Sequence, residues 1–359
     1  MRKGFGFKKN TFFGLLLIFP LIIVAEFYQF NILSGYAFGI INRMIGWLHS
    51  AFVPLDNSYA FPLFFHRLLK FLPFDTAFEW GIFWAIIMNV IFFIILLRKY
   101  KTYTLTEYIF IYASMFILDV FVFNINKDIV QCLIILILYE IALINIKNIY
   151  KLFMICVILF LESLFFRSYY ILGALTTIIV YIVFNKTITN DKKSWLKASI
   201  LILLLLFLCI YITQFIDSEA YNQLLGRRDT LEEDLDANTI ISDMIPGDGY
   251  FNYCLNYLIN LFRMLFPVEL LFKGIKYIPF FVYQIFLTIN ILKNIKSLNK
   301  HNILNLSFVV GYWLMLFASE SDFGTLVRHQ AILLPFYLDI IRNNINNRKK
   351  LKGDGYEKN

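Results

Sequence analysis

Long apolar runs separated by short polar stretches dominate this chain. It has 359 residues, of which 59% are hydrophobic and only 16% are charged. A soluble domain cannot bury that much apolar surface, whereas a helix of about 20 apolar residues crosses the hydrocarbon core of a bilayer. We therefore predict an all-α integral membrane protein with about ten transmembrane helices. The predicted spans are residues 11–33, 79–97, 104–123, 129–146, 150–166, 169–184, 198–216, 277–292, 303–318 and 324–341.

The basic residues indicate on which side of the membrane each loop lies. About two thirds of the 33 lysines and arginines fall in the two tails and in every second loop. Because cytoplasmic loops carry the excess of positive charge, we expect both termini to be cytoplasmic, in one polytopic domain in the cytoplasmic membrane. The cytoplasmic tail is then 342–359, and the two large outer loops are about 34–78 and 217–276. The net charge of +8 reflects this topology and not a nucleic-acid-binding patch.

Part of the second outer loop has apolar residues at helical spacing. The segment 250–276 fits either an eleventh span or a surface or re-entrant helix. An eleventh span would move the basic C-terminal tail to the outside, so the charge distribution favours the surface or re-entrant helix.

Several cations on the predicted outer side lie close to apolar sequence. Arg167 joins two short spans, so its turn should lie below the outer membrane surface, while Arg263 and Arg328 are flanked by apolar residues. Arginine stays charged and its planar fork suits pyrophosphate oxygens. Lys127, in the tight turn NINKDIVQ, should lie near the same surface. The alternative is that each cation reaches lipid headgroups or pairs with a structural carboxylate, such as Asp128 beside Lys127.

A histidine directly follows the last of these arginines. His329 could remove a proton from a sugar hydroxyl near neutral pH. Adjacent residues on a helix point about 100° apart, so Arg328 and His329 face one target only where the backbone is irregular, which Gly324 would permit. Asp322 and Glu320 precede His329 and are competing bases or arginine partners.

Motifs for other chemistries are missing from the sequence. No P-loop, GxSxG or HExxH pattern occurs, which disfavours nucleotide-driven transport and soluble-hydrolase chemistry. The four cysteines are scattered singly in apolar runs and predict neither a disulfide framework nor a metal site. The acidic run EEDLD at 232–236 matches no calcium loop and is typical of a solvated loop. We expect no metal and no cofactor.

Three segments resemble one family of membrane enzymes. They are SDFGTLVRHQAILLPF at 321–336, FNINKDIVQCLIILILYEIAL at 123–143 and FFRSYYILG at 165–173. With the many helices and the outer arginines, they resemble the Wzy-type polysaccharide polymerases and the related EpsG-like group of capsule, exopolysaccharide and O-antigen clusters. The chain departs from that pattern at Ser321, where proline would be expected, and at Gln330, where an acidic residue is common.

The resemblance implies a glycosyl transfer at the outer face of the membrane. One undecaprenyl-pyrophosphate-linked oligosaccharide attacks the anomeric carbon of another, and undecaprenyl pyrophosphate leaves. Arg167, Arg263, Arg328 and Lys127 would bind the pyrophosphate, while His329 or Asp322, with Arg328, would carry the catalysis. The lipid bilayer, a flippase and a chain-length regulator are the expected partners, and no nucleic acid is involved.

Two other functions compete with polymerisation. Another lipid-linked-sugar glycosyltransferase would need paired carboxylates in the first outer loop, which has only the isolated Asp56 and Asp75. A flippase or transporter of the lipid-linked oligosaccharide would need cations along its whole path. The inner half of the spans is instead largely apolar, and the main charged residues well inside the spans are Asp119, Glu140 and Glu162.

Overall fold

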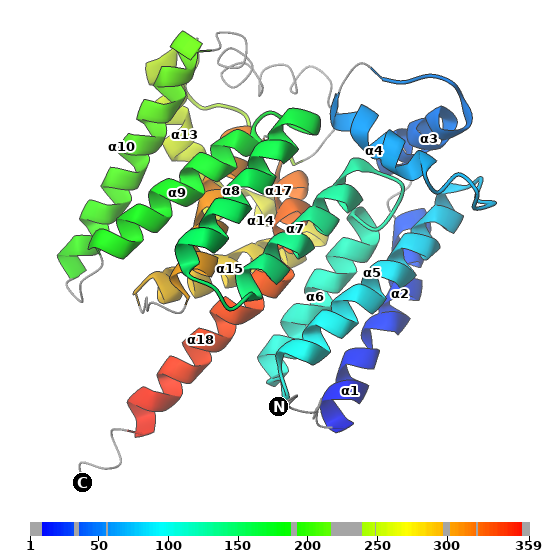
Figure 1. The fold of residues 1–359 in the computed structure, drawn as a ribbon, viewed down its shortest axis with the longest axis horizontal. Helices are drawn as coiled ribbons and strands as arrows, with labels where there is room; N and C mark the ends of the chain where they lie inside the picture. Colours follow the sequence, from blue (N-terminus) through cyan, green and yellow to red (C-terminus); the bar gives the residue numbers. More distant parts are fainter. Residues whose placement is uncertain are drawn as a thin grey trace. The chain divides into compact units, whose positions relative to one another are not determined.

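The chain forms a helical protein (Figure 1). The structure, a computed structural model, describes residues 9–31, 36–54, 57–187, 192–216, 239–247, 249–296, 302–320 and 322–353. Within these residues no β-strand forms, and Ile240 and Asp322 make a single isolated antiparallel bridge. The all-α prediction is confirmed for this part of the chain.

The helices of the described residues occur in the following order along the chain. They are α1 (Lys9–Leu16), α2 (Ile18–Asn31), α3 (Tyr36–His49), α4 (Asn57–Arg67), α5 (Ala77–Lys99), α6 (Leu105–Phe121), α7 (Lys127–Leu143), α8 (Asn148–Phe165), α9 (Tyr170–Thr187), α10 (Lys192–Ile216), α13 (Tyr250–Leu265), α14 (Glu269–Phe272), the 3₁₀ helix η1 (Ile275–Tyr277), α15 (Ile278–Lys296), α16 (Ile303–Ser319), α17 (Phe323–Ala331) and α18 (Leu334–Gly353).

Four helical stretches of the described chain are long and apolar enough to cross a membrane. They are Lys9–Asn31, Ala77–Lys99, Asn148–Phe165 and Ile275–Lys296. Shorter apolar helices occupy Tyr170–Lys186, Lys197–Ile212 and Ile303–Ser319. These stretches support a membrane protein, while the number of ten spans and their orientation stay predictions.

The last predicted span, 324–341, is two helices and not one. α17 ends at Ala331 and α18 begins at Leu334. Pro335 explains the interruption, because proline has no N–H to donate to the carbonyl of Ala331 and its ring clashes there. With nine residues, α17 is about 13 Å long, too short to cross a bilayer alone. α18 continues to Gly353, into the predicted tail.

The chain divides into two compact units, which we describe separately. The first consists of residues 1–140, 165–167 and 331–335, and the second of the remaining residues. In the first unit α2 packs against α5 and α6. Capping boxes begin two of these helices: Thr76 pairs with Glu79 at α5, and Thr104 pairs with Glu107 at α6. Each box satisfies N–H groups that would otherwise have no partner at the helix start.

Most of the described part of the first outer loop is helical. α3 and α4 lie there, and Arg67 donates to the carbonyls of Trp47, Ser50 and Phe52 at 3.1, 3.0 and 2.7 Å. His66 on α4 is completely buried, and its Nδ1 lies 2.7 Å from the carbonyl of Pro62. The three hydrogen bonds from Arg67 therefore hold the chain that follows α3 against α4.

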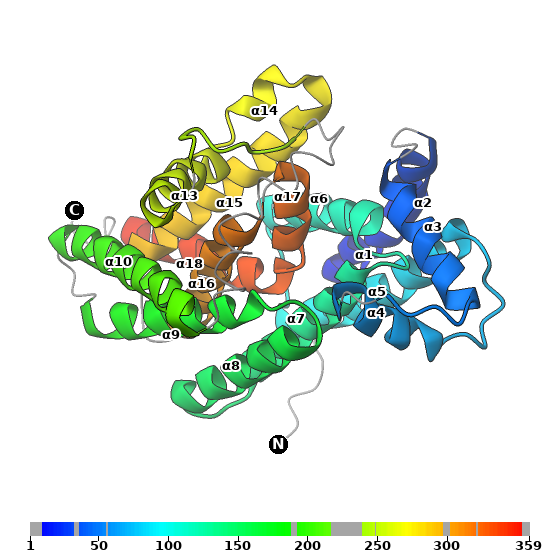
Figure 2. The same cartoon turned by 90° about the horizontal axis from the view of Figure 1, so that it is seen from above.

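In the second unit α9 packs against both α10 and α16, and Figure 2 shows the three helices near one another. Gly311 on α16 allows the close approach to α9, because a Cβ atom there would lie 2.6 Å from the backbone nitrogen of Thr177. The hydroxyl of Thr176 donates to the carbonyl of Gly311 at 2.8 Å. Small residues and hydroxyl groups of this kind let apolar helices pack at short range.

Candidate functional site

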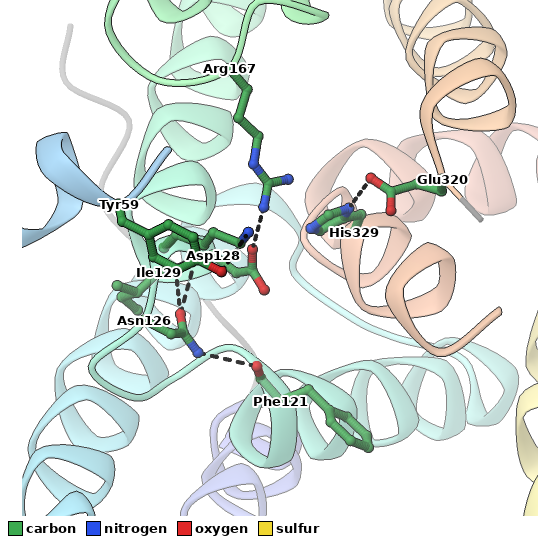
Figure 3. A network of polar contacts seen from close by, with 9 residues as sticks. Tyr59, Phe121, Asn126, Asp128, Ile129, Arg167, Glu320 and His329 are labelled. Carbon is green, nitrogen blue, oxygen red and sulfur yellow. Dashed lines mark hydrogen bonds and ion pairs between the residues drawn. The ribbon is translucent and has the colours of Figure 1, made fainter. Parts of the chain in front are cut away.

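Each unit contains buried charged residues that the sequence singled out. In the first unit, the Nη2 atom of Arg167 lies 3.5 Å from Oδ1 of Asp128, and Figure 3 shows the guanidinium directed at this carboxylate. The two side chains are only 6% and 3% exposed. Arg167 lies in the turn two residues after the end of α8, and Asp128 lies in the first turn of α7. The pair is therefore a buried ion pair joined by one long contact.

The turn before α7 fixes the position of Asp128. Oδ1 of Asn126 accepts the backbone N–H groups of Asp128 at 2.9 Å and Ile129 at 3.1 Å. Nδ2 of Asn126 donates to the carbonyl of Phe121 at 3.3 Å (Figure 3). Asn126 thus acts as the N-cap of α7, and the helix N-terminus favours the negative charge of Asp128.

Lys127 has an aromatic neighbour. Its Nζ atom lies 4.5 Å from the ring centroid of Tyr59 and 3.4 Å from the Tyr59 hydroxyl. A cation above a tyrosine face is attracted by the ring quadrupole. This contact holds Lys127 near α4, and its predicted role in pyrophosphate binding stays a prediction.

In the second unit, Arg263 is held by a carboxylate. Its Nε and Nη2 atoms both contact Glu269, Nη2 at 2.9 Å, so the pair is bidentate. Nη1 also donates to the carbonyl of Ser242 at 2.6 Å and to Oδ1 of Asn260 at 2.8 Å. These contacts fit the structural alternative for Arg263, and we leave it out of the proposed reaction.

His329 on α17 pairs with Glu320 at the end of α16. Nδ1 of His329 lies 3.0 Å from Oε1 of Glu320, and Figure 3 shows the carboxylate beside the ring. The imidazole is completely buried and the Glu320 side chain is 7% exposed. When Nδ1–H is donated to Glu320, the lone pair that accepts a proton lies on Nε2. The sequence named both residues but could not show that they pair.

Asp322 caps α17. Its Oδ2 atom accepts the backbone N–H of Thr325 at 2.7 Å, and Oδ1 accepts the hydroxyl of Thr239. An aspartate that receives the first N–H groups of a helix is a typical N-cap. The contacts therefore support a structural role for Asp322, and its catalytic role stays an untested prediction.

Arg328 and His329 lie on one regular helix. Gly324, which could have made the backbone irregular, lies within α17 and has no positive φ. The two neighbouring side chains consequently leave the helix about 100° apart, and the irregular backbone that would let them face one target is not present in α17. Arg328 is half-buried.

Gln330 follows on the same helix and was noted in the sequence only as a departure from the family pattern. It is completely buried, and neither its Oε1 nor its Nε2 atom has a hydrogen-bond partner. A buried amide without partners costs free energy, and Gln330 leaves α17 about 100° away from the adjacent His329.

No group of three or more metal-binding side chains occurs in the described part of the chain. The acidic run 232–236 and Ser321 lie outside it. Comparisons with protein-family models, curated proteins and solved structures found no match for this chain. The functional argument therefore depends on the geometry of the site and on the sequence resemblance.

Proposed function

We propose that this protein polymerises undecaprenyl-pyrophosphate-linked oligosaccharide repeat units into a surface polysaccharide at the outer face of the cytoplasmic membrane. The observation that carries the proposal is the buried His329–Glu320 pair, at 3.0 Å, whose histidine lies in the segment that resembles the polymerases. A histidine oriented by a carboxylate is suited to general-base catalysis.

In the proposed reaction the terminal sugar hydroxyl of one unit attacks the anomeric carbon of another. Nε2 of His329 takes the hydroxyl proton, a new C–O bond forms, and the bond from the anomeric carbon to the pyrophosphate oxygen breaks. The negative charge of Glu320 stabilises the imidazolium that forms. The pyrophosphate leaves with the electron pair of the broken bond, so the reaction needs no nucleotide.

The different directions of His329 and Arg328 are compatible with this reaction. In a displacement the attacking hydroxyl and the leaving oxygen lie on opposite sides of the anomeric carbon. A base and a cation that face different ways can then serve the two ends of the reacting centre. Arg328 stays charged at every relevant pH and would stabilise the pyrophosphate as its negative charge develops. The pyrophosphate roles of Arg167 and Lys127 remain predictions from the sequence.

The test is polymer formation by the purified protein in liposomes with a synthetic undecaprenyl-pyrophosphate oligosaccharide. We expect the wild type to give a ladder of products on a gel and His329→Gln to give none. A matched control is His49→Gln on α3, where the histidine is 44% exposed and lies 3.5 Å from Asp75. It should keep the ladder.

A ladder that survives His329→Gln would remove the proposed base. A wild type that forms no glycosidic bond, but carries the lipid-linked oligosaccharide across the liposome bilayer, would replace the polymerase with a transporter.

A further inference from the structure

A group of buried polar residues in the first unit takes no part in the proposed reaction. It lies where α2, α5 and α6 pack together, and α2 and α5 belong to candidate membrane spans. Two carboxyl groups belong to it, Glu26 on α2 and Asp119 on α6, which are 4% and 1% exposed. Acidic residues in such helices are costly and are usually functional.

The two carboxyl groups have few hydrogen-bond donors. Neither oxygen of Glu26 has a partner, although both are buried. Asp119 accepts one hydrogen bond, from Nδ2 of Asn89 at 2.6 Å, and its other oxygen has none. Glu26 lies within electrostatic range of Asp119, so the two charges would repel each other if both were ionised.

Amide side chains extend the same group. Asn89 on α5 and Gln29 on α2 are buried, and the carbonyl oxygen of each side chain has no partner. On the donor side, Nδ2 of Asn124 is also buried without a partner. These residues therefore contribute five acceptor oxygens and one donor that lack partners.

Gly81 on α5 leaves room for part of the group. A Cβ atom at Gly81 would lie 2.9 Å from Oε1 of Glu26 and 3.0 Å from Nδ2 of Asn124. Glu26 and Asn124 therefore approach the same spot on α5. An alanine at Gly81 would push at least one of them away.

The group has more acceptor oxygens than donors, so the partner that would satisfy it is a proton or a cation. Buried oxygens are stable when they receive protons or bind a cation, and hard oxygen ligands are the type that small hard cations prefer. We propose that Glu26 and Asp119, with Asn89 and Gln29, form a binding site for a small cation, either Na⁺ or H⁺. The proposal does not depend on the polymerase reaction.

Other titratable or charged groups lie on the same helices and on those packed against them. They include Lys9 on α1, Tyr28 on α2, Arg43 and His49 on α3, Tyr59, His66 and Arg67 on α4, Glu79, Arg98 and Lys99 on α5, and Glu107, Tyr108 and Tyr112 on α6. None of them makes a hydrogen bond or ion pair with Glu26 or Asp119. The cation must therefore come from solution.

The first experiment measures the melting temperature of the purified protein in detergent. NaCl is varied against choline chloride at constant ionic strength, and the series is repeated from acidic to alkaline pH. If Na⁺ is bound, Tm should rise by about 2 °C or more with NaCl at alkaline pH. If protons are bound, Tm should depend on pH and not on Na⁺.

Two variants that keep the side-chain shape remove the charge: Glu26→Gln and Asp119→Asn. Each should abolish the wild-type response to Na⁺, or the part of the pH response at alkaline pH, where His66 is neutral in both the folded and the unfolded protein. The matched control is Glu140→Gln on α7, an acid that is 42% exposed and 3.5 Å from Arg98, and it should respond as the wild type does. Variants that respond as the wild type does would overturn the proposal.

A second measurement uses only the wild-type protein, in case the variants do not fold. A hydrophobic carbodiimide converts buried protonated carboxyl groups to N-acylureas, which mass spectrometry can locate. We expect labelling at Glu26 or Asp119 that Na⁺ suppresses if sodium binds, or that only alkaline pH suppresses if protons bind. Labelling that neither condition changes, or no labelling at either residue, would overturn the proposal.

Discussion

Replacing Glu320 by glutamine tests the proposed catalytic pair most directly. Glutamine keeps the size of the side chain and an oxygen that can accept the Nδ1–H of His329, but it lacks the negative charge. The two groups are in contact at 3.0 Å, which places their charge centres about 4 Å apart. At an effective dielectric constant of about 20, the carboxylate then stabilises an imidazolium by about 4 kcal/mol.

Only part of that stabilisation applies in the transition state, because the proton is then only partly transferred and the imidazole carries only part of the positive charge. With half of it, the barrier rises by about 2 kcal/mol, which slows the reaction about 30-fold. The loss should appear in kcat, since the charge acts when the proton moves and not when the sugar binds. His329→Gln removes the base itself and should cost about 100-fold or more.

The assay is the initial rate of glycosidic bond formation in liposomes at saturating substrate. Asp322→Asn is the matched control, because asparagine caps a helix about as well as aspartate does. It should retain both Tm and kcat. A wild-type kcat in Glu320→Gln would refute the role of the carboxylate. A large loss of kcat in Asp322→Asn, with Tm unchanged, would transfer the role of base to Asp322.

Three further predictions concern stability, each measured by thermal unfolding in detergent. Asp128→Asn removes the negative charge beside the buried Arg167 and should destabilise the protein by about 3–5 kcal/mol, whereas a loss below about 1 kcal/mol would mean that the long contact contributes little. Burial lowers the pKa of His66 to about 4, from 6.5 in the unfolded chain, so the unfolded state binds more protons between these two pH values. Stability should therefore fall by up to about 3 kcal/mol as pH falls from 6.5 to 4. His66→Asn should flatten this dependence, and an unchanged slope would contradict the assignment to His66. Gly311→Ala should lower the free energy of unfolding by about 1–3 kcal/mol, because the added methyl group meets the backbone of α9. Gly46→Ala is the control: the space around Gly46 is open, so this variant should be neutral or slightly stabilising. Equal effects of the two substitutions would contradict the packing argument.

The positions of the helices could be predicted because each depends on local sequence. Apolar runs mark their extent, and the Thr76 and Thr104 capping boxes mark two of their starts. The break after Ala331 was missed, although Pro335 is a local signal for it, because the apolar run continues across the proline. An apolar pattern reports which residues avoid water and not whether the backbone stays helical.

The partners of the charged residues could not be predicted in the same way. Arg263 and Glu269 are six residues apart, but the turn after α13 that joins them has no apolar periodicity. Glu320 and His329 meet only because the chain reverses between α16 and α17. Glu26 was missed altogether, because one acid in a long apolar run does not interrupt the pattern.

These polar and charged residues differ in whether their hydrogen-bonding atoms have partners. Arg263 has a bidentate carboxylate and Asp322 has its helix N–H groups, so neither needs a ligand to offset the cost of burial. Glu26 and Gln330 are buried more deeply than these two residues, and their side-chain oxygens and the Gln330 nitrogen have no partner. Each such group destabilises the folded protein by about 1–3 kcal/mol. Glu26 lies in the apolar helix α2 and Gln330 in the more polar α17, and for Glu26 the proposed cation would supply the missing partner.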